Sequence, residues 1–171
     1  MPPLSDDKYD LNKIIVKPLY FGLVVNVLIP MGLLFACYYF EGQQSGYNRI
    51  GESANPVFYL FCACALAQAA VALWWRSRLM KQPMIRKQET FEHDLIANLA
   101  SVSQQIFVII AAISLWGLVY YYLTARFKET VVLVLFSFIV FQFVRPRFAF
   151  IRKLIASQEE LVKQGKFLQG G

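Results

Sequence analysis

Apolar residues dominate four long stretches of this chain, which are almost free of charge and cover residues 19–40, 57–75, 106–123 and 131–144. An α-helix rises about 1.5 Å per residue, so about 20 apolar residues span the roughly 30 Å hydrocarbon core of a membrane. The fourth stretch reaches this length only if it includes Arg145 and Arg147 or begins before Val131. The pattern predicts an all-α membrane protein, a single integral membrane domain over residues 1–171. Its four transmembrane helices, two hairpins in one bundle, are expected at residues 19–40, 57–75, 106–123 and 130–150.

Two further stretches repeat apolar residues with the period of a helix. In residues 87–105, apolar side chains recur at steps of three or four, at Phe91, Leu95, Leu99 and Val102. Residues 151–166 carry a similar stripe, at Ile151, Leu154, Ile155, Leu161 and Val162. We predict an amphipathic helix over 87–105 that continues into the third transmembrane helix, and a C-terminal helix over 151–166. The two stripes either pack together as a short stalk or lie flat in the headgroup layer, and the mixed charge of both segments favours the stalk.

Composition and charge extend this prediction to orientation. The chain is 57% hydrophobic and 16% charged, whereas a soluble domain carries about 25% charged residues. Fourteen of its 17 lysines and arginines, beginning with Lys8, lie before the first apolar stretch, between the second and third, or after the fourth. Lys and Arg near helix ends remain in the cytoplasm during insertion. Both termini are therefore expected in the cytoplasm, and we expect the inner membrane of a prokaryote.

The second and fourth apolar stretches both end in Arg-x-Arg, followed by Ile-Arg-Lys. Basic residues accumulate at any cytoplasmic helix end, so coincidence is the simpler interpretation. The alternative is a duplicated helical hairpin, which would form a parallel repeat.

Four arginines near these ends are candidate contacts for a partner subunit or for lipid: Arg76, Arg78, Arg145 and Arg147. A guanidinium at the membrane boundary either extends into the headgroup layer or binds a carboxylate or a lipid phosphate. Arg145 is the strongest candidate, because a helix over 130–150 would place it about one turn inside the boundary.

A few uncharged polar residues lie within the apolar stretches. Asn26, Gln68 and Gln142 are candidate interhelical hydrogen-bonding residues, each contributing on the order of 1 kcal/mol. Alanines concentrated between Ala63 and Ala72 allow close backbone approach, which predicts the second transmembrane helix at the centre of the bundle. Pro30 predicts a kink in the first.

Charge and histidine content argue against several kinds of catalysis and transport. All eleven carboxylates lie outside the apolar stretches, whereas ion-coupled transporters usually place Asp or Glu within the membrane. His93 is the only histidine, and no lysine lies within an apolar stretch. The sequence therefore predicts no haem, no retinal Schiff base, no metal site and no other cofactor, and nothing in it indicates a nucleic-acid partner.

Three cysteines, Cys37, Cys62 and Cys64, raise one redox possibility. Membrane thiol oxidoreductases related to disulfide-bond formation protein B and vitamin K epoxide reductase also have four helices and about this size. They use a Cys-x-x-Cys pair and loop cysteines, whereas this chain has Cys-Ala-Cys and no cysteine in a loop. The activity would require Cys37 to lie within about 7 Å (Cα to Cα) of Cys62 or Cys64.

These observations favour a non-catalytic accessory, assembly or scaffold subunit of a larger membrane complex. Its expected partners are membrane lipids and either other membrane subunits or further copies of this chain. The main alternative is a small oligomeric transporter or channel in which Asn26, Gln68 and Gln142 line one path. A thiol oxidoreductase is the third possibility.

Overall fold

The computed structural model describes residues 11–41 and 49–168, and this part of the chain contains helices and no strand. Lys8, one of the charges used to predict the orientation, lies outside the described residues, as do residues 42–48 of the loop between the first two apolar stretches and the last three residues. The helices are α1 (Leu11–Leu23), the π-helical turn η1 (Val24–Leu28), α2 (Ile29–Glu41), α3 (Ala54–Arg78), α4 (Phe91–Thr124), α5 (Phe127–Val144) and α6 (Phe148–Lys163), with 3-10 turns at η2 (Gly51–Ser53) and η3 (Gln88–Thr90). Four helical segments are long and apolar enough to cross a membrane, which confirms that part of the sequence prediction.

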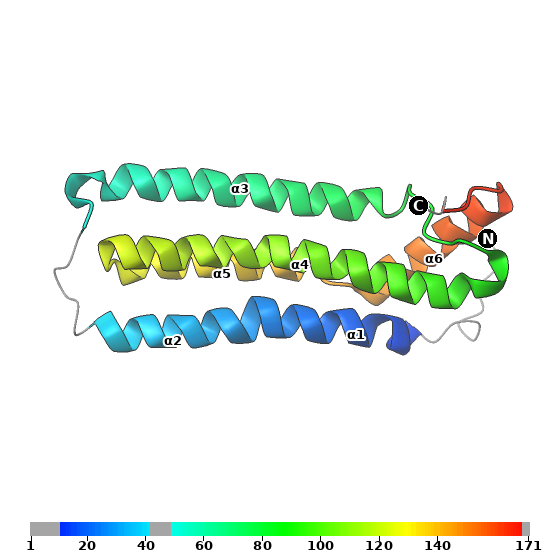
Figure 1. Ribbon diagram of the computed structural model, residues 1–171, viewed down its shortest axis with the longest axis horizontal. Coiled ribbons are helices and arrows are strands. Elements are labelled where there is room, and N and C mark those ends of the chain that lie inside the picture. The colour runs from blue at the N-terminus through cyan, green and yellow to red at the C-terminus, as the bar shows by residue number, and fades with distance from the viewer. Residues whose placement is uncertain (1–10, 42–48, 169–171) are drawn as a thin grey trace.

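The helices lie side by side in a layered arrangement. The pair α4 and α5 occupies the middle, α3 lies along one side, and α1 with α2 lies along the other (Figure 1). The start of α1 and the whole of α6 lie at the same end of the molecule (Figure 1).

The helix at the centre is α4, so the prediction that the second transmembrane helix is central is wrong. In the most apolar 18-residue window of each segment, 44% of the α4 residues are buried and only 22% of the α3 residues. The buried alanines of α3, Ala65, Ala69 and Ala72, form one face. Alanine allows close approach on that face, but it is too small to fill space in several directions. Large buried side chains on several faces of α4, among them Leu95, Phe107 and Tyr120, fill that space.

The first membrane-length segment changes its helical geometry in the middle. Pro30 lacks a backbone N–H and its ring crowds the carbonyl four residues earlier, and the π-helical turn η1 immediately precedes it. Within this turn the N–H of Ile29 bonds the carbonyl of Val24, five residues back. Gly22 lies just before η1, and a Cβ at this position would lie 2.7 Å from the Phe141 ring and 2.8 Å from the Phe107 ring. Glycine therefore permits α1 to pack closely against α4 and α5.

The fourth membrane-length helix begins and ends earlier than predicted. It runs from Phe127 to Val144 rather than over residues 130–150, and Arg145 to Arg147 are not helical. A residue before proline is disfavoured in the α-helical region, and Arg145 accordingly has φ −52° and ψ 145°. Arg145 therefore follows the end of the helix instead of lying one turn inside it. The chain changes direction at Pro146, and α6 begins at Phe148.

The amphipathic segment and the third apolar stretch form one continuous helix, α4, of 34 residues. Its first turn is fixed by Asp94, whose carboxylate accepts the backbone N–H of Arg86 at 2.9 Å and the hydroxyl of Thr90 at 2.8 Å. The helix thus begins at a defined place and carries the apolar stripe of its first turns directly into the central layer.

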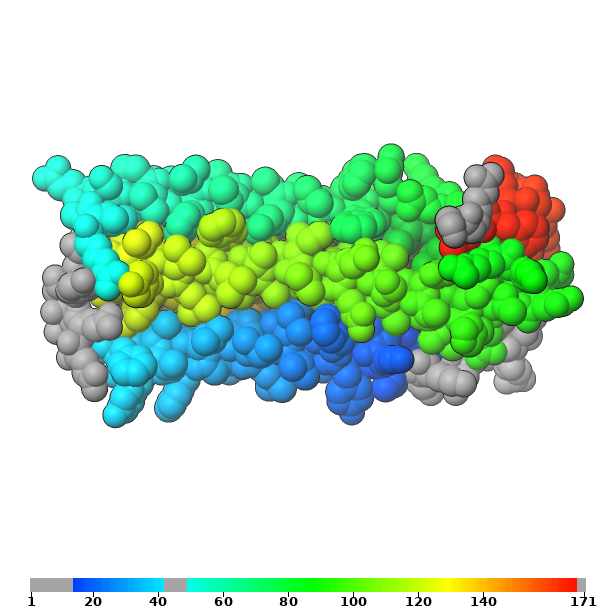
Figure 2. All heavy atoms as spheres, viewed as in Figure 1, coloured from blue at the N-terminus to red at the C-terminus, as the bar shows by residue number. Residues whose placement is uncertain are grey.

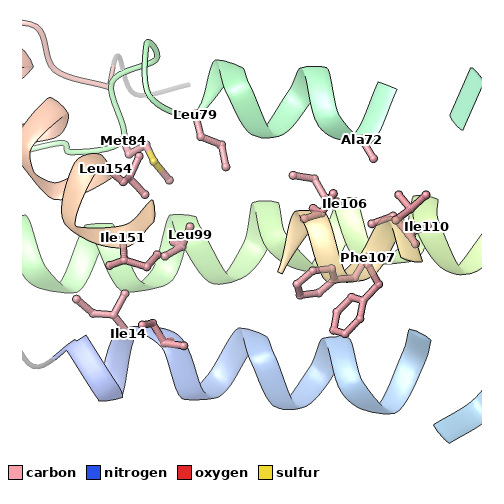
Figure 3. Packing of buried hydrophobic residues seen from close by; sticks show 14 of the residues in the cluster. Ile14, Ala72, Leu79, Met84, Leu99, Ile106, Phe107, Ile110, Ile151 and Leu154 are labelled. Carbon is pink, nitrogen blue, oxygen red and sulfur yellow. The ribbon is translucent and has the colours of Figure 1, made fainter. Parts of the chain in front are cut away.

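Most of each predicted stripe is buried at the α6 end of the molecule, and Val102, Leu161 and Val162 are partly buried. Close packing brings Ile151 towards Leu99, and Leu154 towards Met84 (Figure 3). The same cluster takes in the start of α1 and the connection between α3 and α4. Its members at this end also include Ile14, Ile15, Leu79, Ile85, Phe91, Leu95 and Ile155. We call residues 79–105 and 148–168 the end cap. Protein covers most of each apolar stripe of the end cap, so these residues are not free to lie on a membrane surface.

Candidate functional site

The end of α5 determines where the candidate basic residues lie. In an α-helix each carbonyl accepts the N–H four residues later, and the last carbonyls need other donors. The carbonyl of Phe141 accepts the N–H of Arg145 at 2.8 Å. The carbonyl of Gln142 has no such donor, because the residue four places later is Pro146, which has no N–H.

Two arginine side chains supply donors at this helix end. Arg147 Nη2 donates to the carbonyl of Gln142 at 3.0 Å, and Arg76 Nη1, from the last turn of α3, donates to the carbonyl of Phe143. Positive side chains also offset the partial negative charge at a helix C-terminus. Arg76 and Arg147, which we call the arginine pair, therefore cap α5 and attach the end of α3 to it.

The arginine pair differs from the neighbouring basic residues in its surroundings. The Arg76 guanidinium is half-buried, with Cζ 4.3 Å from the centroid of the Phe150 ring. It lies close enough to Arg147 for the two positive charges to repel. Arg78 is exposed and stacks instead on its own helix, with Cζ 4.3 Å from the centroid of the Trp74 ring. The structure therefore brings together only two of the four candidate arginines.

No carboxylate among the described residues forms an ion pair with any of the four candidate arginines. Arg145 is half-buried and uses its backbone N–H, not a charged contact, to close α5. The positive charge at this end of α3 and α5 is thus met only by carbonyl dipoles and aromatic rings from within the described chain.

The three candidate polar residues make separate contacts. Asn26 is 1% exposed, and its Nδ2 donates to the carbonyl of Gly22 at 3.3 Å. The Oδ1 atom of Asn26 has no hydrogen-bond partner in the structure. Gln68 Oε1 accepts the Trp116 Nε1–H at 3.0 Å, which joins α3 to α4. Gln142 is half-buried near the end of α5, where its backbone carbonyl binds Arg147. These contacts do not converge on a shared polar surface.

The cysteines do not form a pair. Cys37, Cys62 and Cys64 are all free thiols. Cys37 is on α2, the other two are on α3, and these helices lie on opposite sides of α4 and α5 (Figure 1). The backbone carbonyl of Cys37 accepts a hydrogen bond from the Tyr121 hydroxyl at 2.7 Å. This arrangement does not meet the geometric requirement of the thiol oxidoreductase, which needs Cys37 beside Cys62 or Cys64.

A surface groove of about 780 Å³ lies between α1 and the start of α4. Its lining includes Lys17, Glu89, Glu92 and His93. The His93 side chain is 87% exposed, with Nδ1 3.9 Å from an oxygen of Asp94. Within the described residues, no group of three or more His, Cys, Asp and Glu side chains is placed to hold a metal ion.

The sequence interpretation missed a buried residue, Gln158, that helps to join the two parts of the end cap. Gln158 of α6 is fully buried; its Oε1 accepts the Met84 N–H at 2.9 Å, and its Nε2 donates to the carbonyls of Gln82 at 3.0 Å and Leu79 at 3.3 Å. A signal was present, because residue 158 continues the stripe of Ile151, Leu154 and Ile155 at helical spacing. A polar residue on a buried face needs partners, but the spacing does not identify them.

Comparison with known proteins gives no further assignment. No family model matches the chain, and no curated protein or solved structure matches it significantly.

Proposed function

We propose that this protein is a four-helix bundle of a prokaryotic inner membrane, with both termini cytoplasmic, and that it serves as a non-catalytic accessory, assembly or scaffold subunit of a larger membrane complex. The end cap would then lie on the cytoplasmic side. The proposal rests on the membrane-length helices, the distribution of Lys and Arg, and the covered surface of the end cap.

Exposed aromatic side chains indicate which part of the first membrane-length segment would span the hydrocarbon core. Tyr and Trp favour the two membrane interfaces. Tyr38 and Tyr39 are 63% and 65% exposed near the end of α2, and Tyr20 is 67% exposed in α1. Tyr20 and Tyr38 are separated by about 27 Å of helix at about 1.5 Å per residue, close to the roughly 30 Å hydrocarbon core. Residues before Tyr20 would therefore lie in the cytoplasm beside the end cap.

The observation that carries the accessory role is the apolar surface left uncovered on two helices. In their most apolar windows, only 17% of the α1–α2 residues and 22% of the α3 residues are buried. These helices form the lower and upper edges of the molecule (Figure 2). Their outer faces suit the apolar surface of a neighbouring membrane subunit, with lipid covering the remainder.

One observation favours the alternative of an oligomeric transporter or channel. The partnerless Oδ1 of Asn26 lies in the spanning region, where an unpaired polar group is costly and often functional. Against this alternative, Asn26, Gln68 and Gln142 make separate contacts. The accessory role therefore remains the better supported function.

Co-purification tests the proposal. The full chain is extracted from its native membrane into nanodiscs, and the mass and composition of the assembly are determined. The accessory role predicts a stable assembly with other membrane subunits. A homo-oligomer that conducts a solute would support the transporter, and a monomer without partners would contradict the accessory role.

A matched pair of variants locates the contact. Ala67→Phe adds bulk to the exposed side of α3 and is expected to release a protein neighbour, since a close helix contact cannot absorb a ring as fluid lipid can. Leu135→Phe, at a position of α5 that is 53% exposed, is the control. Equal retention of partners by both variants would show that α3 is not the contact.

A further inference from the structure

The arginine pair places two positive charges on adjacent carbonyls. Arg147 and Arg76 bind the carbonyls of Gln142 and Phe143, so the pair is held at one place where α3 and α5 both end. Like charges so close repel, and the described chain supplies no carboxylate to either residue. An anion from outside the chain would relieve this repulsion.

The pair keeps hydrogen-bond donors for such an anion. A guanidinium has five N–H donors in a planar fork, and each member of the pair uses one on an α5 carbonyl. The hydrogen bond to the Phe143 carbonyl and the contact with the Phe150 ring hold Arg76 in place. Arg147 is exposed, so its remaining donors can reach a ligand from outside the chain. Phosphate, like carboxylate, fits such planar donors, and it is the anionic group that phospholipids supply.

Apolar residues beside the pair indicate the source of the phosphate. Trp74, Phe143 and Phe148 are within four residues of the pair along the chain and are 55%, 62% and 52% exposed. The crevice beside Arg76 has a volume of only about 10 Å³, so a headgroup would lie on the surface rather than in a pocket. A phosphate attached to acyl chains would use both the arginines and the exposed aromatic side chains, whereas free phosphate would use only the arginines.

We propose that Arg76 and Arg147 bind the phosphate of an anionic phospholipid in the cytoplasmic leaflet, with its acyl chains along the outer surfaces of α3 and α5. This inference rests on the proposed membrane insertion and orientation. The single negative charge of the lipid phosphate offsets part of the positive charge of the pair, and the bound lipid holds this end of the membrane helices at a fixed depth in the bilayer.

Lipid preference of the full-length protein tests the proposal. The purified protein receives dioctanoyl phosphatidylglycerol, dioctanoyl phosphatidylcholine, glycerol 3-phosphate or inorganic phosphate, and bound lipid and thermal unfolding are measured by native mass spectrometry and fluorescence. We expect phosphatidylglycerol to bind and stabilise more than phosphatidylcholine, and the two soluble phosphates to have little effect. Equal responses to both lipids would overturn the proposal, and so would equal stabilisation by inorganic phosphate, because the site would then be one for a free anion.

Charge variants locate the site. Arg76→Gln and Arg147→Gln retain an N–H donor for the α5 carbonyls but remove the charge, and each is expected to weaken phosphatidylglycerol binding about fivefold, from about 1 kcal/mol per basic residue near an anionic surface. Lys163→Gln, an exposed position at the end of α6, removes the same charge away from the pair and should change binding little. Unchanged binding in both pair variants, or equal loss in all three, would contradict the assignment.

Two further outcomes of the lipid experiment show which part of the proposal is wrong. If a pair variant unfolds, the wild-type preference for phosphatidylglycerol over phosphatidylcholine still decides the proposal. If the wild type retains neither lipid, or retains both equally, the arginine site fails. The proposed membrane insertion is tested separately, by the labelling of intact cells. Co-purification of protein subunits is independent of these readings.

Discussion

At the scale of single residues, Gln158 makes the clearest stability prediction. Gln158→Leu removes its three hydrogen bonds and leaves the Met84 N–H and the Gln82 carbonyl without these partners. A buried unsatisfied group such as the Met84 N–H costs about 1–3 kcal/mol, so we expect the end cap to lose about that much stability. Hydrogen exchange of the Met84 amide, followed by mass spectrometry in detergent, measures the loss.

Gln164→Leu is the matched control for this prediction. Gln164 lies outside the buried stripe on the exposed end of the same segment, where its Nε2 is 3.4 Å from a Glu160 carboxylate oxygen. We expect a change within about 0.5 kcal/mol, as for most surface substitutions. Equal acceleration of Met84 exchange in both variants would show that Gln158 does not hold the end cap together.

The same residues show how far the sequence determines a site. Helical spacing places position 158 on a buried stripe, but its partners are 74 to 79 residues away in the chain, and no local pattern encodes them. Arg76 and Arg147 stand out because they follow apolar stretches. Their capping role depends on which helix end lies beside them, which only the packing of α3 against α5 establishes.

At the scale of helices, the number of membrane-length segments follows from the sequence, because apolar length is a local property. Their ends and their arrangement follow less directly. Pro146 ends α5 early, since the residue before a proline avoids helical geometry, and the apolar pattern alone runs past it. The central position of α4 depends on large buried side chains on several faces of the helix, which a count of alanines in α3 does not capture.

Two glycines in the first membrane-length segment give a prediction at this scale. Gly22→Ala places a methyl group 2.7 to 2.8 Å from the Phe141 and Phe107 rings, and overpacking of this kind typically costs about 1–3 kcal/mol. Gly32→Ala meets nothing within 4 Å, so the better helix propensity of alanine should leave stability unchanged or raise it by up to about 1 kcal/mol. Thermal unfolding of both variants in detergent is the measurement. A similar response of the two would contradict the close packing of α1 against the central layer.

At the scale of the whole molecule, the unequal distribution of Lys and Arg between its two ends predicts the orientation of the chain in the membrane. The end cap and the described ends of the chain lie together (Figure 1), and most of the Lys and Arg residues lie at that end. Arg49, Arg126 and Lys128 are the basic residues of the opposite end, where Arg126 Nη1 lies 3.6 Å from a Glu129 carboxylate oxygen. Because translocating many basic residues is disfavoured, the cap end should stay in the cytoplasm.

Cysteine labelling of intact cells tests this orientation. In a chain whose three cysteines are replaced by alanine, Lys163→Cys and Glu52→Cys each introduce one exposed thiol, at the cap end and at the opposite end. A membrane-impermeant maleimide should label the Glu52 variant in intact cells, whereas the Lys163 variant should react only after permeabilisation, and the cysteine-free chain should not react. The reverse pattern would place the end cap outside the cell and remove the arginine pair from the cytoplasmic leaflet. Labelling of both variants in intact cells would show either mixed insertion or a chain that does not cross the membrane, and protease protection of the end cap separates these two cases.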